Sequence, residues 1–405
     1  MNGESVKKKG NNQMPDVFNF VGKIALGKDS EKFHPIEKKE FNSGWMNTTV
    51  KFNCISGTNR VLCMTQGGKW KDDKKNTIKT YSKSTTDANG KVTKGEKIDI
   101  AWAKRFDADQ IDKVAGFRRF VCDTGDVKMR YKLQDVVDGK VEIDDDMIEI
   151  GIDSIDAAKT ALEKSNAKRK IFLSEWDFAE HMAKVAASDK FKDKLFKISG
   201  NYDVSYNAEK DRFYINYHVN RVVLASDDTE LATELKVDFY FGEDAWDDSQ
   251  YEETGKCHVN GWVSYYDNSV SKNGFMPMSV AVKENEKKSA ALKRKFTADD
   301  EIKQIGLTLK VIDGAEVVEI TMDMLDEETR EDIELGLVSF EEVKRSLGGR
   351  AVGDRISELR FVELTPKKNV AQETVYTPDD MHAARVELVE ETDEENYDLF
   401  DEDDL

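Results

Sequence analysis

One stretch of the chain combines cations with aromatic rings in a way that could do chemistry. Residues 45–120 contain 16 lysines and arginines against 8 aspartates and glutamates, in a chain of 405 residues whose formal net charge is −19. Positive side chains neutralise phosphates and flat rings stack on bases, a combination typical of sequence-tolerant binding to single-stranded nucleic acid. A solvated surface of strands and loops above core aromatics is the alternative interpretation of the same pattern.

The candidate binding residues are the rings and cations that stand closest together in this stretch. The densest groups are residues 69–71, residues 102–106 and residues 117–120. The nucleic-acid-binding residues that we predict are Trp45, Lys51, Arg60, Lys69, Trp70, Lys71, Lys74, Lys75, Tyr81, Trp102, Lys104, Arg105, Phe106, Arg118 and Arg119.

Other kinds of chemistry find little support in the sequence. It contains neither a Walker-type phosphate loop nor a G-x-G-x-x-G motif between a strand and a helix. The five histidines are scattered, and Cys257-His258 has no partners at metal-ligand spacing. We therefore predict a binding protein rather than an enzyme, with no catalytic residues, no metal and no cofactor.

Composition favours a soluble protein of the cytoplasm. Charged residues make up 35% of the chain, and no apolar run approaches the length of about 18 residues that a membrane span needs. Residues 1–14 lack the apolar core of a signal peptide, so we expect a flexible arm there. Four cysteines are too few for a disulfide framework in a chain of this length.

The charge is strongly polarised along the chain. Residues 1–140 contain 28 basic and 18 acidic residues, whereas the remainder contains 33 and 62. Residues 387–405 contain 11 acidic and no basic residues, which is the usual composition of a solubilising tail. Apolar side chains within the tail indicate a partner-binding motif instead, for which we predict Tyr397, Asp398, Leu399, Phe400, Asp401, Glu402, Asp403, Asp404 and Leu405.

The elements that would position these residues are mostly strands. Apolar and polar residues alternate over 17–26 and over 48–55, where Val50, Phe52 and Cys54 share one face. Further strands are predicted over 59–64, 98–104, 117–122, 128–133, 195–206, 212–224, 234–241, 257–266, 275–282, 305–312, 317–320 and 356–364, and helices over 107–115, 155–164, 174–194 and 327–347. Quick succession of strands after residue 194 favours a small Greek-key barrel or a sandwich.

Two short correspondences indicate an internal repeat. Residues 59–62 resemble residues 220–223, and residues 136–143 resemble residues 311–320. The order and spacing of the two pairs are similar, which favours two related β-barrel units that each carry a helical segment.

In its architecture the chain resembles the single-stranded DNA-binding proteins of bacteria and bacteriophages. The shared features are β-barrel units, a basic aromatic region and an acidic C-terminal tail with embedded hydrophobic residues. The tail itself departs from the bacterial pattern, in which acids precede Ile-Pro-Phe, because here Leu399-Phe400 is followed by residues 401–405. The resemblance implies OB-fold barrels, and a tail that recruits replication, recombination and repair proteins and competes with DNA for the groove.

On this basis we expect an α+β protein, mainly β with α segments, built from tandem OB-fold-like Greek-key barrels with helical appendages. The expected division is an arm (1–16), a basic first barrel (17–150), a helical connector (151–194), a second barrel (195–295), an α/β appendage (296–368) and a disordered acidic tail (369–405).

The leading hypothesis is a single-stranded DNA-binding protein of phage DNA replication, recombination or repair, active in the bacterial host cytoplasm. Its expected partners are single-stranded DNA, replication or recombination proteins that bind the tail, and a second copy of the chain, with no membrane. A β-rich virion or assembly protein and an RNA-binding factor are the alternatives.

Overall fold

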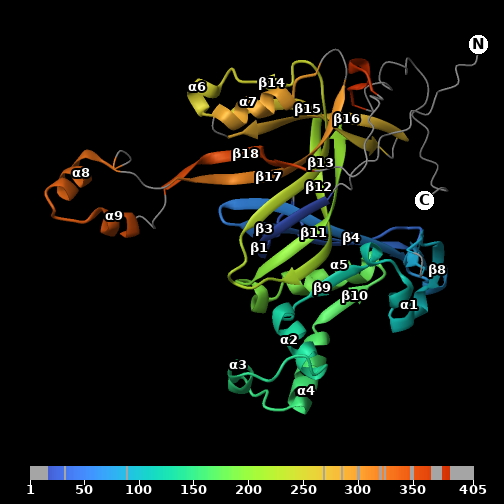
Figure 1. The fold of residues 1–405 in the computed structure, drawn as a ribbon. Helices are drawn as coiled ribbons and strands as arrows, with labels where there is room; N and C mark the ends of the chain where they lie inside the picture. Colours follow the sequence, from blue (N-terminus) through green and yellow to red (C-terminus); the bar gives the residue numbers. More distant parts are fainter. Residues whose placement is uncertain are drawn as a thin grey trace, which may run out of the picture.

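The computed structural model describes residues 17–31, 33–87, 90–267, 270–283, 286–298, 302–318, 322, 325–346, 351–365 and 376–383. Fourteen strands in this part of the chain belong to one hydrogen-bonded sheet, and most helices lie at its periphery (Figure 1). The protein is therefore a mixed α+β structure in which strands predominate, as the sequence predicts.

Five strands of the N-terminal half form a closed circuit of pairings. Each pairs with the next in the order β1, β3, β4, β12, β11 and back to β1. All of these pairings are antiparallel except that of β4 with β12, where Tyr217 lies opposite Cys63. The strands are β1 (Val17–Leu26), β3 (Trp45–Ser56), β4 (Asn59–Trp70), β11 (Leu195–Asn207) and β12 (Arg212–Leu224).

A second circuit repeats this arrangement in the C-terminal half. Its pairings run in the order β13, β15, β16, β18, β17 and back to β13, and that of β16 with β18 is parallel. In both circuits three strands, a helix and two strands follow one another along the chain. The elements are β13 (Ala232–Phe241), β15 (Cys257–Asp267), β16 (Lys272–Val282), helix α7 (Glu286–Lys295), β17 (Lys303–Val318) and β18 (Ala351–Leu364).

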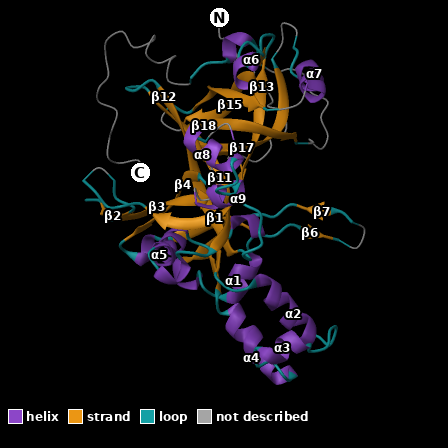
Figure 2. Ribbon diagram, turned by 90° about the vertical axis from the view of Figure 1, so that its left-hand side faces the viewer, coloured by secondary structure: helices purple, strands orange, loops and turns teal. Residues whose placement is uncertain are grey.

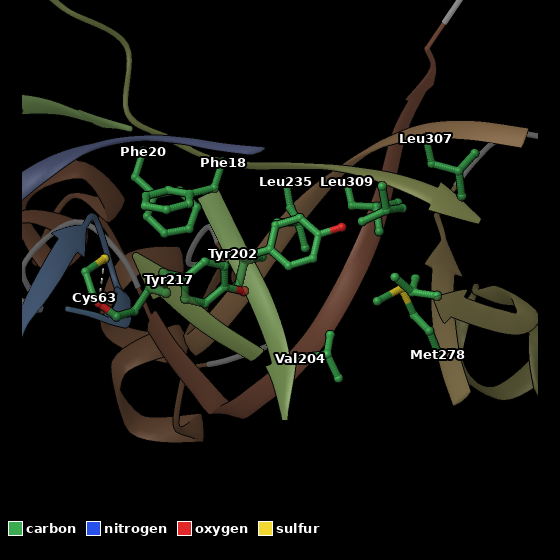
Figure 3. Packing of buried hydrophobic residues seen from close by; sticks show 14 of the residues in the cluster. Phe18, Phe20, Cys63, Tyr202, Val204, Tyr217, Leu235, Met278, Leu307 and Leu309 are labelled. Carbon is green, nitrogen blue, oxygen red and sulfur yellow. Dashed lines mark hydrogen bonds between the residues drawn. The ribbon is translucent and has the colours of Figure 1, made fainter. Parts of the chain in front are cut away.

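Strand β1 joins the two circuits. Its first five residues pair with β11 on one side and β13 on the other, and from Lys23 onward it pairs with β3. The change of partner occurs at Gly22, where a Cβ atom would lie 2.5 Å from the carbonyl oxygen of Ile55. Inward-facing side chains of both circuits consequently belong to one hydrophobic core. In this core Phe18 and Phe20 of β1 lie on the same face of the sheet as Leu235 of β13 (Figure 3).

A long insertion separates β4 from the helix of the first circuit, α5 (Glu175–Ala186). Residues 71–174 contain two small units with their own cores, one around Ile100 and Val114 and one around Leu133 and Met147. The helical unit projects from the sheet, and β6 and β7 form a narrow finger (Figure 2). The elements of the insertion are β5 (Thr77–Tyr81), β6 (Thr85–Thr86), β7 (Val92–Thr93), β8 (Lys97–Ala101), α1 (Ala108–Lys113), β9 (Phe120–Asp123), α2 (Val127–Val137), α3 (Asp145–Glu149), α4 (Ile155–Asn166) and β10 (Arg169–Phe172).

The other elements are short or peripheral. Helices α8 and α9 lie beyond the end of the β17–β18 hairpin (Figure 1). These peripheral elements are β2 (Ile36–Glu40), β14 (Trp246–Asp247), α6 (Tyr251–Thr254), α8 (Glu327–Glu334), α9 (Phe340–Ser346) and short 3-10 helices at Asp73–Lys75, Trp102–Lys104, Gly116–Arg118, Asp189–Phe191 and Pro378–Asp380.

Local signals in the sequence account for several elements. In β3 the residues Val50, Phe52 and Cys54 are buried while their neighbours are half-exposed, which is the predicted alternation. Helix α5 begins after Ser174, whose hydroxyl accepts a hydrogen bond from the backbone N–H of Asp177. The helix ends at Ala186, eight residues earlier than predicted, and the chain continues into a 3-10 turn.

Other local predictions were wrong. Residues 128–133 belong to helix α2 rather than a strand, because the Asp126 side chain caps this segment and Leu133 and Val136 pack in the helical unit. Strand β17 continues through Asp313-Gly314, between the two strands predicted separately over 305–312 and 317–320, and Gly314 lies opposite Asn59 of the first circuit. Two helices, α8 and α9, replace the single helix predicted over 327–347.

The strand pairings also group the chain differently from the expected division. Strands β11 and β12, expected in a second barrel over 195–295, complete the first circuit. Strands β17 and β18, expected in an appendage over 296–368, complete the second. The correspondence of residues 59–62 with residues 220–223 does not relate the circuits, because both segments lie in the first one.

Part of the expected disordered tail has a defined conformation. Residues 376–383 contain the 3-10 turn Pro378–Asp380, and the Tyr376 ring lies 5.5 Å from that of Tyr240 and 5.0 Å from that of Phe275. The remaining residues of the predicted arm and tail, including the motif at 397–405, lie outside the described part of the chain.

We expect the substitution Gly22→Ala to lower the free energy of unfolding by about 1–3 kcal/mol, because the added methyl group would overlap a backbone carbonyl that has little room to move. Urea denaturation measures this difference. The control is Gly116→Ala, where a Cβ would have no neighbour within 4 Å. Equal destabilisation by both substitutions would show that the close approach of β1 and β3 is not the cause.

Candidate nucleic-acid interface

A large hollow lies beside the first circuit, where the insertion folds back onto it. Its volume is about 910 Å³, and it lies between the start of β3, the end of β4, the insertion, the start of α5 and the outer face of β12. Six predicted binding residues line it: Trp45, Trp70, Lys75, Trp102, Arg118 and Arg119. We refer to this hollow as the tryptophan groove.

Two tryptophans from neighbouring strands form one side of the tryptophan groove. Trp45 and Trp70 lie directly opposite each other on β3 and β4, with ring centroids 5.3 Å apart in an edge-to-face arrangement. The Trp45 ring lies against Gly68, where a Cβ would come within 2.1 Å of the ring. Any larger residue at position 68 would therefore displace this ring.

The backbone of Trp70 is held by a buried amide side chain. Asn76 accepts a hydrogen bond of 2.7 Å from the Trp70 N–H and donates one of 2.9 Å to the Trp70 carbonyl. These two bonds occupy the edge of β4 that faces away from β3. They therefore fix the position from which the Trp70 ring extends.

Cations lie next to these rings. The Lys75 ammonium lies 5.5 Å from the centre of the Trp70 ring, and the Arg118 guanidinium lies 5.3 Å from that of Tyr81 and 5.4 Å from that of Phe117. Lys79 is a third exposed cation on the groove. Within the described residues, none of Lys75, Lys79 and Arg118 has a carboxylate within ion-pair distance, so their charges are available to an anionic ligand.

Other predicted cations are engaged in holding the fold together. Arg105 donates a 2.7 Å hydrogen bond to the Asp177 carboxylate, and both side chains are largely buried. Arg119 donates to the carbonyls of Val114 and Asp112. Two lysines form ion pairs on the surface, Lys69 with Asp73 and Lys71 with Glu40.

The remaining predicted residues differ in their relation to the tryptophan groove. Trp102 lines it but is only 7% exposed, with the Arg105 guanidinium 4.1 Å from its ring centre, so little of its surface can meet a base. Arg60 lies at the opposite end of β4 from Trp70, about 30 Å away at the usual rise of a strand. Lys51, Lys74, Tyr81, Lys104 and Phe106 do not line the groove.

Several groove residues were not among the predicted ones. Phe117 is 75% exposed, and His218 and Asn220 reach the groove from β12. The alternation of β12 contained a signal for the latter two, because His218 and Asn220 belong to its polar face. The His218 ring forms a hydrogen bond with the Asp203 carboxylate. Burial raises the pKa of Asp203, but the hydrogen bonds from His218 and Asn216 lower it more, so the pKa lies below its usual value.

One acidic residue among those described, Glu175, lies on the tryptophan groove at the first position of α5. Its side chain is open to the groove but has protein on most sides. This enclosure raises the pKa of Glu175, and the nearby His218 partly opposes the increase. Its negative charge at neutral pH would repel a phosphate bound beside Lys75 and Arg118.

The equivalent face of the second circuit is covered by the chain itself. Tyr240, Trp262 and Phe275 cluster on its outer side, where residues Tyr376 and Met381 pack against them. The Phe275 N–H donates a 2.8 Å hydrogen bond to the His382 carbonyl. This aromatic cluster of the second circuit is therefore covered, whereas that of the first circuit lines an open groove.

The described residues lack two other kinds of feature. They contain no group of three or more His, Cys, Asp or Glu side chains arranged to hold a metal ion. None of their helices is long and apolar enough to cross a membrane.

All four cysteines are buried and free. Burial raises the pKa of Cys54 and of Cys122 to about 12, and the charge of Asp123 contributes to the increase at Cys122.

We expect Glu175→Gln to increase the affinity for an oligonucleotide about three- to tenfold at neutral pH and low salt, since it removes one negative charge near the phosphates. Protonation of Glu175 removes the same charge, so the advantage of the variant should shrink as the pH falls through the raised pKa. Fluorescence titration over a pH series measures this. Glu230→Gln, on an exposed residue away from the groove, is the control, and an equal gain from both variants would contradict the role of Glu175.

Comparison with known proteins gives limited similarity. No protein-family model and no curated protein matches the sequence. Among solved structures, the wild-type single-stranded DNA binding protein from Thermus aquaticus aligns with a TM-score of 0.31 and 8% identity, covering 90% of this chain and 98% of that one. A deletion mutant of the same protein aligns with a TM-score of 0.30 and 8% identity, covering 89% and 98%. The similarity to both is slight in sequence and in spatial arrangement.

Proposed function

We propose that this protein binds single-stranded nucleic acid, and DNA in particular, in the tryptophan groove. The observation that carries the proposal is the Trp45–Trp70 pair on β3 and β4 beside Lys75 and Arg118, two cations without carboxylate partners among the described residues. Rings at fixed positions stack bases of any sequence, and the cations neutralise the phosphates between them. The proposed role is binding rather than catalysis.

Each closed circuit is, in this proposal, an OB-fold barrel. In that fold the third and fifth strands pair in parallel, a helix lies between the third and fourth strands, and ligands bind on the second and third strands. The parallel pairings β4–β12 and β16–β18 and the positions of α5 and α7 support the assignment. The proposed barrels span residues 17–224 and 232–364.

The first barrel is the proposed binding unit because of its open face. Trp45 and Trp70 stand on its second and third strands, whereas the corresponding aromatic cluster of the second barrel is covered by residues 376–383. The basic residues of the sequence also concentrate in 45–120. The second barrel would then serve mainly as a scaffold that is joined to the first along β1.

The biological role that we propose is protection of single-stranded DNA during phage replication, recombination or repair. The acidic segment 387–405, with Tyr397, Leu399 and Phe400, would recruit protein partners, and as a polyanion it would also compete with DNA for the groove. This part of the proposal rests on the composition of the sequence and on its resemblance to single-stranded DNA-binding proteins.

We expect Trp70→Ala to weaken binding to a poly-dT oligomer by about 1–3 kcal/mol, the usual contribution of one stacked base. Trp70→Phe should retain most of the affinity because it keeps a ring at that position. Tyr266→Ala removes an exposed ring from the second circuit and is the control. Fluorescence anisotropy of a labelled oligomer measures all three, and loss of affinity in the control alone would contradict the assignment of the groove.

The double variant Lys75→Ala with Arg118→Ala should reduce the slope of log K against log salt concentration by about 1.4. Each phosphate contact contributes about 0.7 to this slope. Tryptophan quenching across a salt series measures the slope. The double variant Arg294→Ala with Lys295→Ala removes two exposed cations of the second circuit and should leave the slope unchanged.

The same titrations separate the alternatives. Tighter binding to a matched RNA oligomer would favour the RNA-binding role over the DNA-binding one. Absence of quenching by either oligomer at low salt would exclude the proposed function and favour a virion or assembly protein.

A further inference from the structure

A second hollow lies near the tryptophan groove and contains three arginines. It lies between helix α2 and the strands β9, β10 and β12, and its volume is about 330 Å³. Arg130, Arg169 and Arg221 line it, and Asp123 is the sole acidic residue among the described residues that do so. We refer to this hollow as the arginine cavity.

One arginine and the carboxylate neutralise each other. Arg130 donates to both oxygens of Asp123 and also to the carbonyl and the hydroxyl of Ser165. Burial raises the Asp123 pKa, but the hydrogen bonds from Arg130 and from the Gly125 N–H, together with the charges of Arg130 and Arg169, lower it more, so it lies below its usual value. The Arg130–Asp123 pair is therefore part of the fold, and Arg130 is not available to a ligand.

The other two arginines leave a net positive charge of two. Arg169 is the cross-strand neighbour of Asp123, which already accepts both hydrogen bonds from Arg130. Within the described residues, neither Arg169 nor Arg221 has a carboxylate within ion-pair distance. Burial lowers the pKa of Arg221, and the nearby charge of Arg169 lowers it further. Two like charges held close together in a partly buried cavity favour an anion between them.

The arginine cavity follows the tryptophan groove along β12. On this strand Asn220 lines the groove and the next residue, Arg221, lines the cavity. Val121 and Arg221 lie opposite each other in the parallel pairing of β9 with β12. A single strand that leaves the groove across β12 would therefore meet Arg221 next.

A β-bulge aims these residues outward. Gly200 of β11 pairs with Val219 and Ser199 pairs with Arg221, so that Asn220 is the extra residue. Such a bulge lets two successive residues of one strand serve the same face, which an uninterrupted strand does not allow. At the rim, Tyr131 of α2 is 71% exposed and offers a ring for a base.

From this arrangement we infer that the arginine cavity binds a backbone phosphate of the strand held in the tryptophan groove, with Arg169 and Arg221 as its ligands. The ligand class is a phosphodiester of single-stranded nucleic acid, and the inference rests on the proposed function. It extends the binding surface from the first barrel onto the inserted helical unit.

The test uses the double variant Arg169→Ala with Arg221→Ala and two thymidine oligomers of about 8 and about 30 nucleotides. The shorter oligomer is near the lower part of the usual OB-fold site size, and the longer one is well above it. We expect binding of the longer oligomer to weaken about five- to twentyfold, with the slope of log K against log salt reduced by about 0.7, the contribution of the one phosphate that the two arginines share. Binding of the shorter oligomer, which the groove alone can hold, should stay within about twofold, which also shows that the variant is folded.

The outcomes distinguish this inference from the proposed function. Failure of the wild-type protein to bind either oligomer would exclude the function itself. Wild-type binding with an unchanged affinity and salt slope in the double variant would overturn the inference alone. The control, Arg294→Ala with Lys295→Ala, removes the same charge elsewhere and should behave as wild type, and an equal loss there would likewise overturn the inference.

Discussion

The structure depends on the way strand β1 is shared between two circuits of strands. Its first half is bounded by β11 and β13, and its second half leaves β13 and pairs with β3. This exchange needs a residue without a side chain at Gly22, where the two backbones come too close for a Cβ. Because Phe18 and Phe20 point inward from the shared segment, the two circuits have one continuous core and hold each other in place (Figure 3).

The tryptophan groove forms because the insertion that follows β4 folds back beside the end of β4. The rings of Trp45 and Trp70 come from the ends of β3 and β4, whereas Arg118 and Lys79 come from the insertion. Strand β9 then anchors the insertion beside β12, the strand that lines both the groove and the arginine cavity. A site assembled in this way requires the inserted residues to fold before its cations and rings can meet.

The number of cations in the sequence overstates the number that can contact a bound polyanion. Arg105 and Arg119 stand in the densest basic groups of the sequence, yet one is held by Asp177 and the other by backbone carbonyls. Such buried arginines stabilise the insertion through hydrogen bonds that an approaching phosphate would have to replace. The cations that remain free within the described residues are fewer, and they include Lys75 and Arg118 in 3-10 turns and Lys79 on β5.

The sequence by itself determined part of the local structure of this protein, because alternation and capping act between near neighbours. The strand 17–26, the buried face of Val50 and Phe52, and the start of α5 after Ser174 all follow from such signals. Only the tertiary structure decided which strands pair. The contact of β4 with β12 joins Cys63 to Tyr217, and no local pattern specifies a partner so far along the chain. The domain limits and the groove depend on that pairing, since it alone brings His218 and Trp70 to one surface.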